Sequence, residues 1–243
     1  MAMETFPIIL EDANFITPRV RHLFFRRMDG KVLSYIPGQF ISIHFTANDK
    51  ALRRSYSIAS MSQTEAKIEF AISYVPGGPA SELLAALKPG AVLDCSGAYG
   101  RLILRDEPMR RCFLMATGTG VTPYRAMLPQ IIEKLSQDQN LEIFILLGVQ
   151  HRIDQLYVND FLKYSEQHER LHFRVYHSRD SLTAPLPYEH KGYVQSIFDE
   201  VTMDPVGDVV YLCGNPSMID ASYDILKNLG FNAQQVRREK YVS

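Results

Sequence analysis

The sequence predicts an α/β plus β fold: an antiparallel β-barrel over residues 1–106, followed by a parallel α/β domain over residues 107–243. Three observations predict it. The first part alternates apolar and polar residues, which is typical of strands that bury one face. The second part alternates continuous apolar runs with helical patterns, which is typical of parallel strands covered on both faces. With 243 residues, the chain is long enough to give each domain its own core.

In the first part, we expect strands at residues 40–45 ("FISIHF"), 67–75 ("KIEFAISYV") and 91–97 ("AVLDCSG"). Turns rich in Gly and Pro separate these segments. Short, evenly spaced strands of this kind indicate a small antiparallel barrel. Residues 79–88 ("PASELLAALK") are the exception and predict a short helix.

In the second part, we expect buried strands at "CFLMA" (112–116), "IFILL" (143–147) and "VVYLC" (209–213), and an alternating strand at "LHFRV" (171–175). Helical patterns lie between them at residues 123–137, 155–167 and 217–230. The pattern changes near Asp106–Pro108, where we place the domain boundary.

Composition narrows the classes of function. The net charge of −1 argues against a dedicated nucleic-acid binder, because phosphate backbones are held by clustered Lys and Arg. The three cysteines, Cys95, Cys112 and Cys213, form no CxxC pair. They therefore argue against a zinc site, a disulfide framework and a four-thiolate iron–sulfur cluster. Reduced thiols indicate a cytoplasmic protein.

Three further features exclude other classes. Residues 1–15 carry no basic leader before an apolar stretch, so we expect no signal peptide. The longest apolar run, "IFILLGV", falls short of the ~20 residues that cross a bilayer. The seven histidines show no ligand spacing, so we expect no metal, and we interpret residues 172–177 ("HFRVYH") as a strand with surface histidines.

The segment "RRSYSIAS" (53–60) combines two guanidinium groups, an aromatic ring and hydroxyls. In a strand, Tyr56 and Ile58 face one way and Ser55 and Ser57 the other. Such a segment offers an anion clamp, a flat surface and a hydrogen bond, which a planar cofactor with phosphates needs.

Three Gly- and Pro-rich turns are candidate anion sites, because free amides and the helix dipole favour negative charge at a helix start. They are "VPGGPASELL", "ATGTGVTPYRAM" and "YLCGNPSMID". In the last, Asn215 is the expected N-cap and Pro216 the first helical residue. Each turn alone is also compatible with a purely structural role, and Cys213 with a small buried apolar residue.

In this order, the motifs Arg54–Ser57, Gly78–Ser81, Gly118–Pro123 and Cys213–Met218 resemble the ferredoxin–NADP reductase family. The resemblance covers nearly the whole chain, including "YIPGQF" and "LKPGAVLDCSGAYGRL". It implies that the barrel binds FAD and that the α/β half binds a nicotinamide nucleotide.

The resemblance also implies roles for single residues. Arg54 would pair with the FAD pyrophosphate, Tyr56 would stack on the flavin, and Ser57 would hydrogen-bond near flavin N5. The residues implied in FAD binding are Arg54, Ser55, Tyr56, Ser57, Gly78, Pro79, Ala80 and Ser81. The residues implied at the nicotinamide dinucleotide's pyrophosphate are Gly118, Thr119, Gly120, Thr122 and Pro123.

For the rest of the nucleotide, the resemblance implies that Cys213 lies beside nicotinamide C4 and that Tyr193 stacks on adenine. The 2′-phosphate of NADP would be held by Ser178, Arg179 and Lys191. Two nearby acids leave an alternative open: Asp154 and Asp180 could instead bind the ribose diol of NAD.

The C-terminal segment completes the implied catalytic set of Ser57, Cys213, Glu239 and Tyr241. The family often ends in Glu-x-aromatic, with the aromatic ring covering the flavin and yielding to nicotinamide. Here Val242 and Ser243 follow Tyr241, which departs from the plant-type pattern. Taken as a bare tripeptide, the segment is also compatible with a frayed end.

The resemblance therefore implies a reductase that moves electrons between NADPH and an acidic carrier, ferredoxin or flavodoxin, and we expect a monomer with no nucleic acid or membrane as partner. We expect the arginines of the first half and Arg110–Arg111 to dock that carrier. Three alternatives stay open: an NADH-dependent reductase component of an oxygenase, a non-enzymatic FAD electron-transfer subunit, and a protein that has lost its cofactor.

Overall fold

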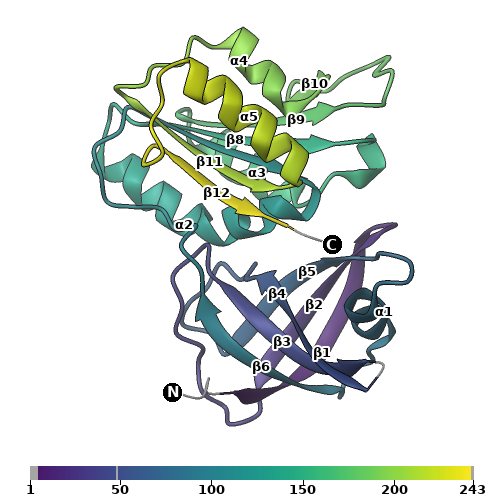
Figure 1. Cartoon of the computed structure of the whole chain (residues 1–243). Helices are drawn as coiled ribbons and strands as arrows, with labels where there is room; N and C mark the ends of the chain where they lie inside the picture. The colour runs from purple at the N-terminus through teal and green to yellow at the C-terminus, as the bar shows by residue number, and fades with distance from the viewer. Residues whose placement is uncertain (1–4, 48, 242–243) are drawn as a thin grey trace.

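Two six-stranded sheets follow one another along the chain in the computed structural model, which describes residues 5–47 and 49–241 (Figure 1). The first sheet is antiparallel and the second is parallel. Residues 100–110 connect them. The predicted fold class is confirmed. The boundary between residues 106 and 107 lies within the connection and stays a prediction.

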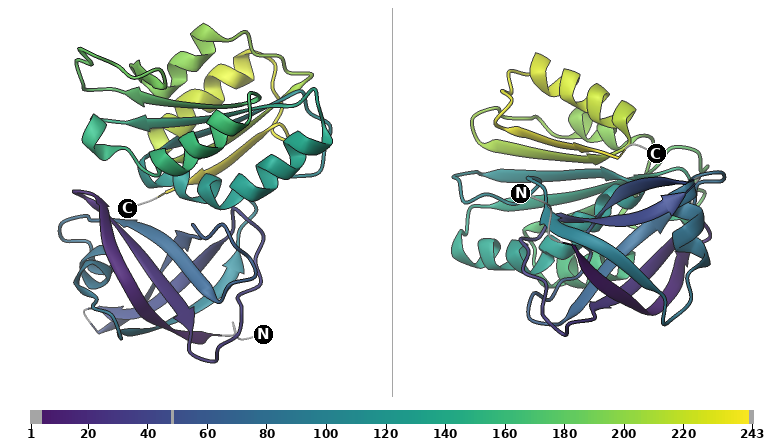
Figure 2. Two further views of the ribbon diagram at one scale, coloured as in Figure 1. Left: turned by 180° about the vertical axis from the view of Figure 1, so that it is seen from behind. Right: turned by 60° about the horizontal axis from the view of Figure 1, so that its bottom comes forward.

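The first sheet curls into a barrel, as both views of Figure 2 show. Its strands are β1 (Phe6–Thr17), β2 (Val20–Arg27), β3 (Phe40–Ala47), β4 (Lys50–Ser57), β5 (Lys67–Ser73) and β6 (Val92–Tyr99), in the order β4-β3-β6-β1-β2-β5. The two edge strands meet just beyond β4, where the Ala59 amide donates to the Glu69 carbonyl at 2.7 Å. Helix α1 (Pro79–Ala86) connects β5 to β6.

The second sheet has the order β10-β9-β8-β7-β11-β12. Its strands are β7 (Arg111–Thr117), β8 (Glu142–Val149), β9 (Leu171–His177), β10 (Glu189–Lys191), β11 (Asp208–Gly214) and β12 (Val236–Lys240). Its α-helices are α2 (Thr122–Gln137), α3 (Val158–Gln167), α4 (Ile197–Glu200) and α5 (Pro216–Asn228). In this sheet, β7 is the first strand along the chain and lies near the centre. Strands β8, β9 and β10 follow on one side of it, and β11 and β12 then pair on its other side. Ligands of open parallel sheets bind at such a reversal.

Helices cover both faces of the second sheet (Figure 2). Leu114 of β7 packs in the core formed with α2 and α3, whereas its neighbour Phe113 packs in the core formed with α4 and α5. Both side chains are fully buried. Burial on both faces explains why the strands of this half are continuous apolar runs.

The interpretation of residues 172–177 as a strand is confirmed, but the placement of His177 at the surface is wrong. His172 is half-buried, and His177 is 0% exposed. The reason is that β9 is an interior strand, paired with β8 and with the short β10. Glu189 of β10 approaches the His177 ring to 3.6 Å and is itself buried.

Arg125 of α2 ties the two halves together. Its Nη1 donates to the Ala59 carbonyl at 2.7 Å and to Glu69 at 2.8 Å, both in the barrel half. Its Nε donates to Asp160 of α3 at 2.6 Å. The side chains of Arg125 and Glu69 are 13% and 12% exposed. Burial alone would raise the pKa of Glu69, but His22 and Arg125 outweigh it and lower the pKa to about 2.

Replacing Arg125 with Met should lower the free energy of unfolding by roughly 3 kcal/mol at pH 7, because it leaves a buried carboxylate without its cation. The lowered pKa of Glu69 stabilises the folded state above about pH 4.5, and this stabilisation is lost as the pH falls toward about 2. The difference in the free energy of unfolding between the variant and wild type should therefore shrink over this pH range. Urea unfolding at pH 7 and pH 3 measures it.

Arg170→Met is the matched control, because Arg170 donates to three main-chain carbonyls within the α/β half and to none in the barrel: those of Leu135, Asp138 and Leu141. Its loss should be similar at both pH values. Equal losses for Arg125→Met at pH 7 and pH 3 would contradict the proposed role of Glu69.

Candidate active site between the two halves

A cavity of about 700 Å³ lies at the carboxyl ends of the central parallel strands, where they face the barrel. Both halves line it. The barrel contributes Thr17, Arg19, Val20, Ser73 and Tyr74. The α/β half contributes, among others, Gly118, Thr119, Asp154, Ser178, Tyr193, Asn215 and Tyr241. The barrel residues were missed by the sequence interpretation, although Ser73 and Tyr74 directly precede the predicted "VPGGP" turn.

The turn after β7 forms the floor of this cavity. It is a 3₁₀ turn, Gly118–Val121, that leads into α2. Gly118 has a φ of +52°, and a Cβ built on it would meet nothing within 4 Å, so its backbone is open to a ligand. A Cβ on Gly120 would lie 2.4 Å from the Cys213 carbonyl oxygen, so Gly120 serves close packing. Of the five predicted residues, Gly118 and Thr119 line the cavity and the others are buried: Gly120, Thr122 and Pro123.

The turn after β11 lies beside the turn after β7. As predicted, Asn215 is the N-cap of α5, and its side chain accepts from the Ser217 amide at 2.8 Å. The Asn215 amide donates to the Thr117 hydroxyl at 2.9 Å, which joins the two turns. Cys213, at the end of β11, is 0% exposed.

The C-terminal segment brings the implied catalytic residues together. Strand β12 pairs with β11 so that Glu239 lies opposite Cys213. The Tyr241 amide donates to the Gly214 carbonyl at 2.8 Å. The Tyr241 hydroxyl donates to Ser57 Oγ of the barrel at 2.5 Å, and Ser57 Oγ donates to Glu239 at 3.4 Å. The segment is therefore strand β12, which ends at Lys240, followed by a hydrogen-bonded Tyr241, and not a frayed end. Val242 and Ser243 lie outside the described residues.

Burial sets the protonation states in this cluster. It raises the pKa of Glu239 to about 7, against the hydrogen bond from Ser57. It also raises the pKa of the Cys213 thiol and of the Tyr241 hydroxyl well above their ordinary values. Cys213 and Tyr241 are therefore neutral at physiological pH, whereas Glu239 can gain or lose a proton there.

On the barrel, β4 presents the first predicted motif. Arg54 is exposed and donates to the Arg53 carbonyl at 3.0 Å. Tyr56 is half-buried, and its ring stacks on Phe70 with 5.3 Å between centroids. Ser55 faces away, with its hydroxyl 3.3 Å from that of Ser42. An exposed guanidinium beside a rigidly backed aromatic ring fits a flat cofactor that carries phosphate.

The helix start at Gly78–Ser81 is shaped by Ser81. Its hydroxyl accepts from the Val75 amide at 3.1 Å and donates to the Val75 and Gly78 carbonyls at 2.8 and 3.0 Å. Gly78 is the N-cap, and Pro79 and Ala80 form the first turn. The side chain of Ser81 thus fastens the turn, which leaves the backbone amides of the helix start as the groups that could bind an anion.

At the far end of the cavity lie the residues predicted to bind a 2′-phosphate and adenine. Ser178 lines the cavity, and its hydroxyl donates to the Val149 carbonyl at 3.2 Å. Tyr193 also lines it and is 70% exposed, as a stacking surface requires. Arg179 and Lys191 are exposed and are not among the residues that line the cavity; Arg179 follows Ser178, and Lys191 precedes Tyr193 by two residues. Their roles stay predictions.

Known proteins resemble the chain over both halves. Residues 7–103 match the family model described as an oxidoreductase FAD-binding domain, and residues 114–224 match that of an oxidoreductase NAD-binding domain. The chain is 31% identical to ferredoxin–NADP reductase B of Sorangium cellulosum (strain So ce56) over 235 residues, which cover 93% of each protein.

Two further relatives broaden the comparison. The chain is 28% identical to the toluate 1,2-dioxygenase electron transfer component of Pseudomonas putida, over 87% of this chain and 60% of that protein. The structure of a ferredoxin NADP⁺ reductase from Neisseria gonorrhoeae with bound FAD and NADP matches with a TM-score of 0.81, over 97% of this chain and 98% of that one. At 18% identity, this likeness shows the fold alone. Within residues 5–47 and 49–241, no helix is long and apolar enough to cross a membrane.

Glu239→Gln should make the protein more stable than wild type at high pH, because Gln imitates the protonated acid. The folded state raises the pKa of Glu239 from 4.5 to about 7, so ionisation destabilises wild type as the pH rises between these values. The difference should be near zero below pH 4.5 and reach at most about 3 kcal/mol above pH 7. Thermal unfolding from pH 4 to pH 9 measures it.

The control is Glu166→Gln, which changes an exposed acid of α3. It should unfold like wild type at every pH. A Glu239→Gln protein whose unfolding midpoint tracks wild type across the whole range would mean that burial does not perturb Glu239.

Proposed function

Because the chain belongs to the ferredoxin–NADP reductase family of FAD-dependent oxidoreductases, we propose that it moves electrons between NADPH and ferredoxin or flavodoxin. The observation that carries the proposal is the meeting of Ser57 from one half with Glu239 and Tyr241 from the other. This junction lies beside the nucleotide-sized cavity, at the reversal point of the parallel sheet.

FAD supplies the chemistry that links a two-electron hydride donor with one-electron acceptors. The chain's own residues bind and orient. Arg54 holds the pyrophosphate, as guanidinium groups do through charge-assisted hydrogen bonds. Tyr56 offers its ring to the flavin and is kept in place by Phe70. Ser57 presents a hydroxyl at the junction, where two partners already orient it.

On the nucleotide side, the backbone of Gly118 and Thr119 receives the pyrophosphate, because both residues line the cavity at the start of α2. Tyr241 lines the same cavity with its hydroxyl on Ser57, so we propose that its ring moves aside when nicotinamide approaches. Ser178, Arg179 and Lys191 hold the 2′-phosphate, which makes NADPH the favoured nucleotide.

Glu239 is the residue that accepts and releases a proton in the proposed reaction. Its raised pKa, near 7, lets it hold or release a proton at working pH, and Ser57 connects it to the reacting edge. Cys213 is a fully buried, neutral thiol beneath the site, so it does not act as a nucleophile.

Several of the arginines that we expected to dock the carrier form hydrogen bonds within the protein. Arg111 binds Asp208 through two hydrogen bonds, and Arg110 binds Asp204. Arg21 donates to the carbonyls that end α1.

A second cavity, of about 520 Å³, offers a better docking face because it reaches Glu239. Three exposed arginines line it: Arg101, Arg105 and Arg238. We propose that this face receives the acidic carrier, through attraction that salt screens. The unpaired cysteines suit a reducing compartment, and we propose a cytoplasmic monomer.

A second candidate function is the NADH-dependent reductase component of an oxygenase. The similarity to the toluate dioxygenase component favours it, although the chain spans only 60% of that protein. Three scattered cysteines cannot hold a four-thiolate cluster, so such a role would need a separate ferredoxin.

Anaerobic titration of the purified protein with NADPH and NADH in parallel, followed by addition of ferredoxin or flavodoxin, tests the proposal. We expect a yellow protein whose flavin absorbance bleaches at lower NADPH than NADH concentration and returns when the carrier is added. A protein that takes up no FAD on reconstitution would refute the proposal. A preference for NADH would favour the oxygenase component.

Arg179→Ala should raise the KM for NADPH roughly tenfold or more and leave the KM for NADH nearly unchanged, because only NADPH carries the phosphate that the guanidinium binds. Steady-state kinetics with a one-electron dye as acceptor measures both. Equal effects on the two nucleotides would refute the assignment of Arg179.

A further inference from the structure

Asp180 directly follows the predicted phosphate-binding pair Ser178 and Arg179, yet its carboxylate is engaged within the protein. Oδ1 lies 2.8 Å from His151 Nδ1, and Oδ2 accepts from the Arg152 amide. The Asp180 side chain is 26% exposed. These partners hold the pKa of Asp180 below its ordinary value, the His151 hydrogen bond contributing most. Asp180 is therefore an ionised anchor of its turn, with both oxygens already bound.

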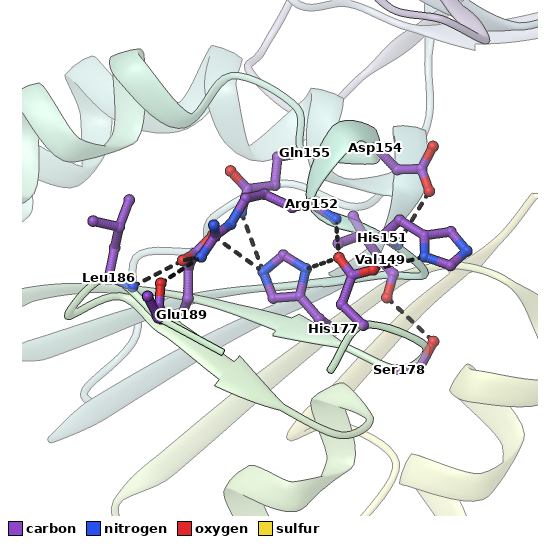
Figure 3. Close-up of polar contacts among 11 residues, drawn as sticks. Val149, His151, Arg152, Asp154, Gln155, His177, Ser178, Leu186 and Glu189 are labelled. Carbon is purple, nitrogen blue, oxygen red and sulfur yellow. Dashed lines mark hydrogen bonds and ion pairs between the residues drawn. The ribbon is translucent and has the colours of Figure 1, made fainter. Parts of the chain in front are cut away.

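From Asp180, a polar network continues through His177 and Gln155 to Glu189, and Figure 3 shows the contacts among these last three residues. His177 Nδ1 lies 3.7 Å from Asp180, and Gln155 Nε2 lies 3.1 Å from His177 Nε2. Gln155 also donates to Glu189 at 2.7 Å. Burial lowers the pKa of His177, so the ring is neutral. A ring that accepts from Gln155 at Nε2 carries its proton on Nδ1, facing Asp180.

Glu189 ends the network and is fully buried as a side chain. Arg152 donates to it through Nε, at 2.7 Å, and through Nη2. The Leu186 amide donates to it at 2.8 Å. A buried carboxylate with this many donors is held in one position.

The network joins the two segments predicted to hold the 2′-phosphate. His177 immediately precedes Ser178 and Arg179, and Glu189 precedes Lys191 by two residues, with Tyr193 two residues further. The main chain adds one more tie, because the Gly192 amide donates to the His177 carbonyl at 2.9 Å. The short 3₁₀ turn Arg152–Asp154 bridges both segments from one side.

We propose that Asp180 and Glu189 are positioning residues that set the selectivity for a 2′-phosphorylated nucleotide, by fixing Ser178, Arg179 and Lys191 relative to one another. This inference rests on the proposed NADPH-binding function. It assigns Asp180 a role opposite to the one that its charge suggests. An acid beside a phosphate site should repel the phosphate, or bind the ribose diol of NADH instead.

The two roles predict that Asp180→Ala changes the KM for NADPH in opposite directions. If Asp180 anchors the turn, Asp180→Ala raises the KM for NADPH roughly tenfold, because charged hydrogen bonds are lost, while kcat and the KM for NADH change by less than about twofold. If Asp180 acts through its charge, the same change lowers the KM for NADPH. Steady-state kinetics with both nucleotides distinguishes the two.

Asp180→Asn provides the rescue test. Asn keeps an acceptor for the Arg152 amide and can donate to His151 in its other tautomer, so it restores most of the geometry without the charge. We expect near-wild-type selectivity. Failure of Asp180→Asn to rescue, or improved NADPH binding in either variant, overturns the proposal.

Glu189→Gln tests the other end of the network, because Gln has one acceptor oxygen where the acid accepts from Arg152, Gln155 and Leu186. It should also weaken NADPH selectively, although it removes a negative charge. Thermal unfolding identifies any variant that is not folded. Asp199→Asn, at an exposed acid of α4, is the control and should leave both KM values unchanged.

The wild-type protein separates failure of this inference from failure of the proposed function. Absence of any preference for NADPH in wild type would remove the selectivity itself and overturn both. A clear preference in wild type that survives in Asp180→Ala and in Glu189→Gln would overturn only the positioning role.

Discussion

The pairing of β12 with β11 is the constraint on which the site depends. It places Glu239 opposite Cys213 and delivers Tyr241 to Ser57, a residue 184 positions earlier in the chain. A five-residue strand at a sheet edge thereby brings the two halves together at this junction, where we propose that the reaction takes place. The contact works only if the halves keep their relative position, which makes the buried Arg125 contacts part of the site although they lie away from the cavity.

Burial at this junction also determines which of its polar groups can change protonation state near neutral pH. Desolvation keeps Cys213 and Tyr241 neutral, and only Glu239 is brought to a pKa near neutral pH. A single titrating group in a dry cluster can exchange a proton without placing a second charge beside it. As a consequence, the free energy of unfolding is lower at high pH, because the ionised form of Glu239 is less stable in the folded protein than in water.

The sequence predicted what depends on local patterns and missed what depends on distant partners. Periodicity predicted the barrel and the buried strands, and Gly or Pro signals predicted the turns at Gly118 and Asn215, because each is determined within a few residues. Strand β12 ("VRREK") has no apolar period, and β10 is three residues long, so only pairing across the sheet defines them. For the same reason His177 was misplaced at the surface, and Asp180 was indistinguishable in sequence from Asp154.

The separation of the two cavities offers a physical reason why relatives with different names can share one fold. We propose that the nucleotide is selected at the ends of β9 and β10, and the arginine-lined cavity beside Glu239 contains no residue of either strand. Tyr241 lines the first cavity, Glu239 lines the second, and the two cavities have no lining residue in common, so each surface can change while the junction is kept. A ferredoxin–NADP reductase and a dioxygenase electron transfer component are both similar to this chain, as expected of a fold that keeps its junction while the surfaces around it change.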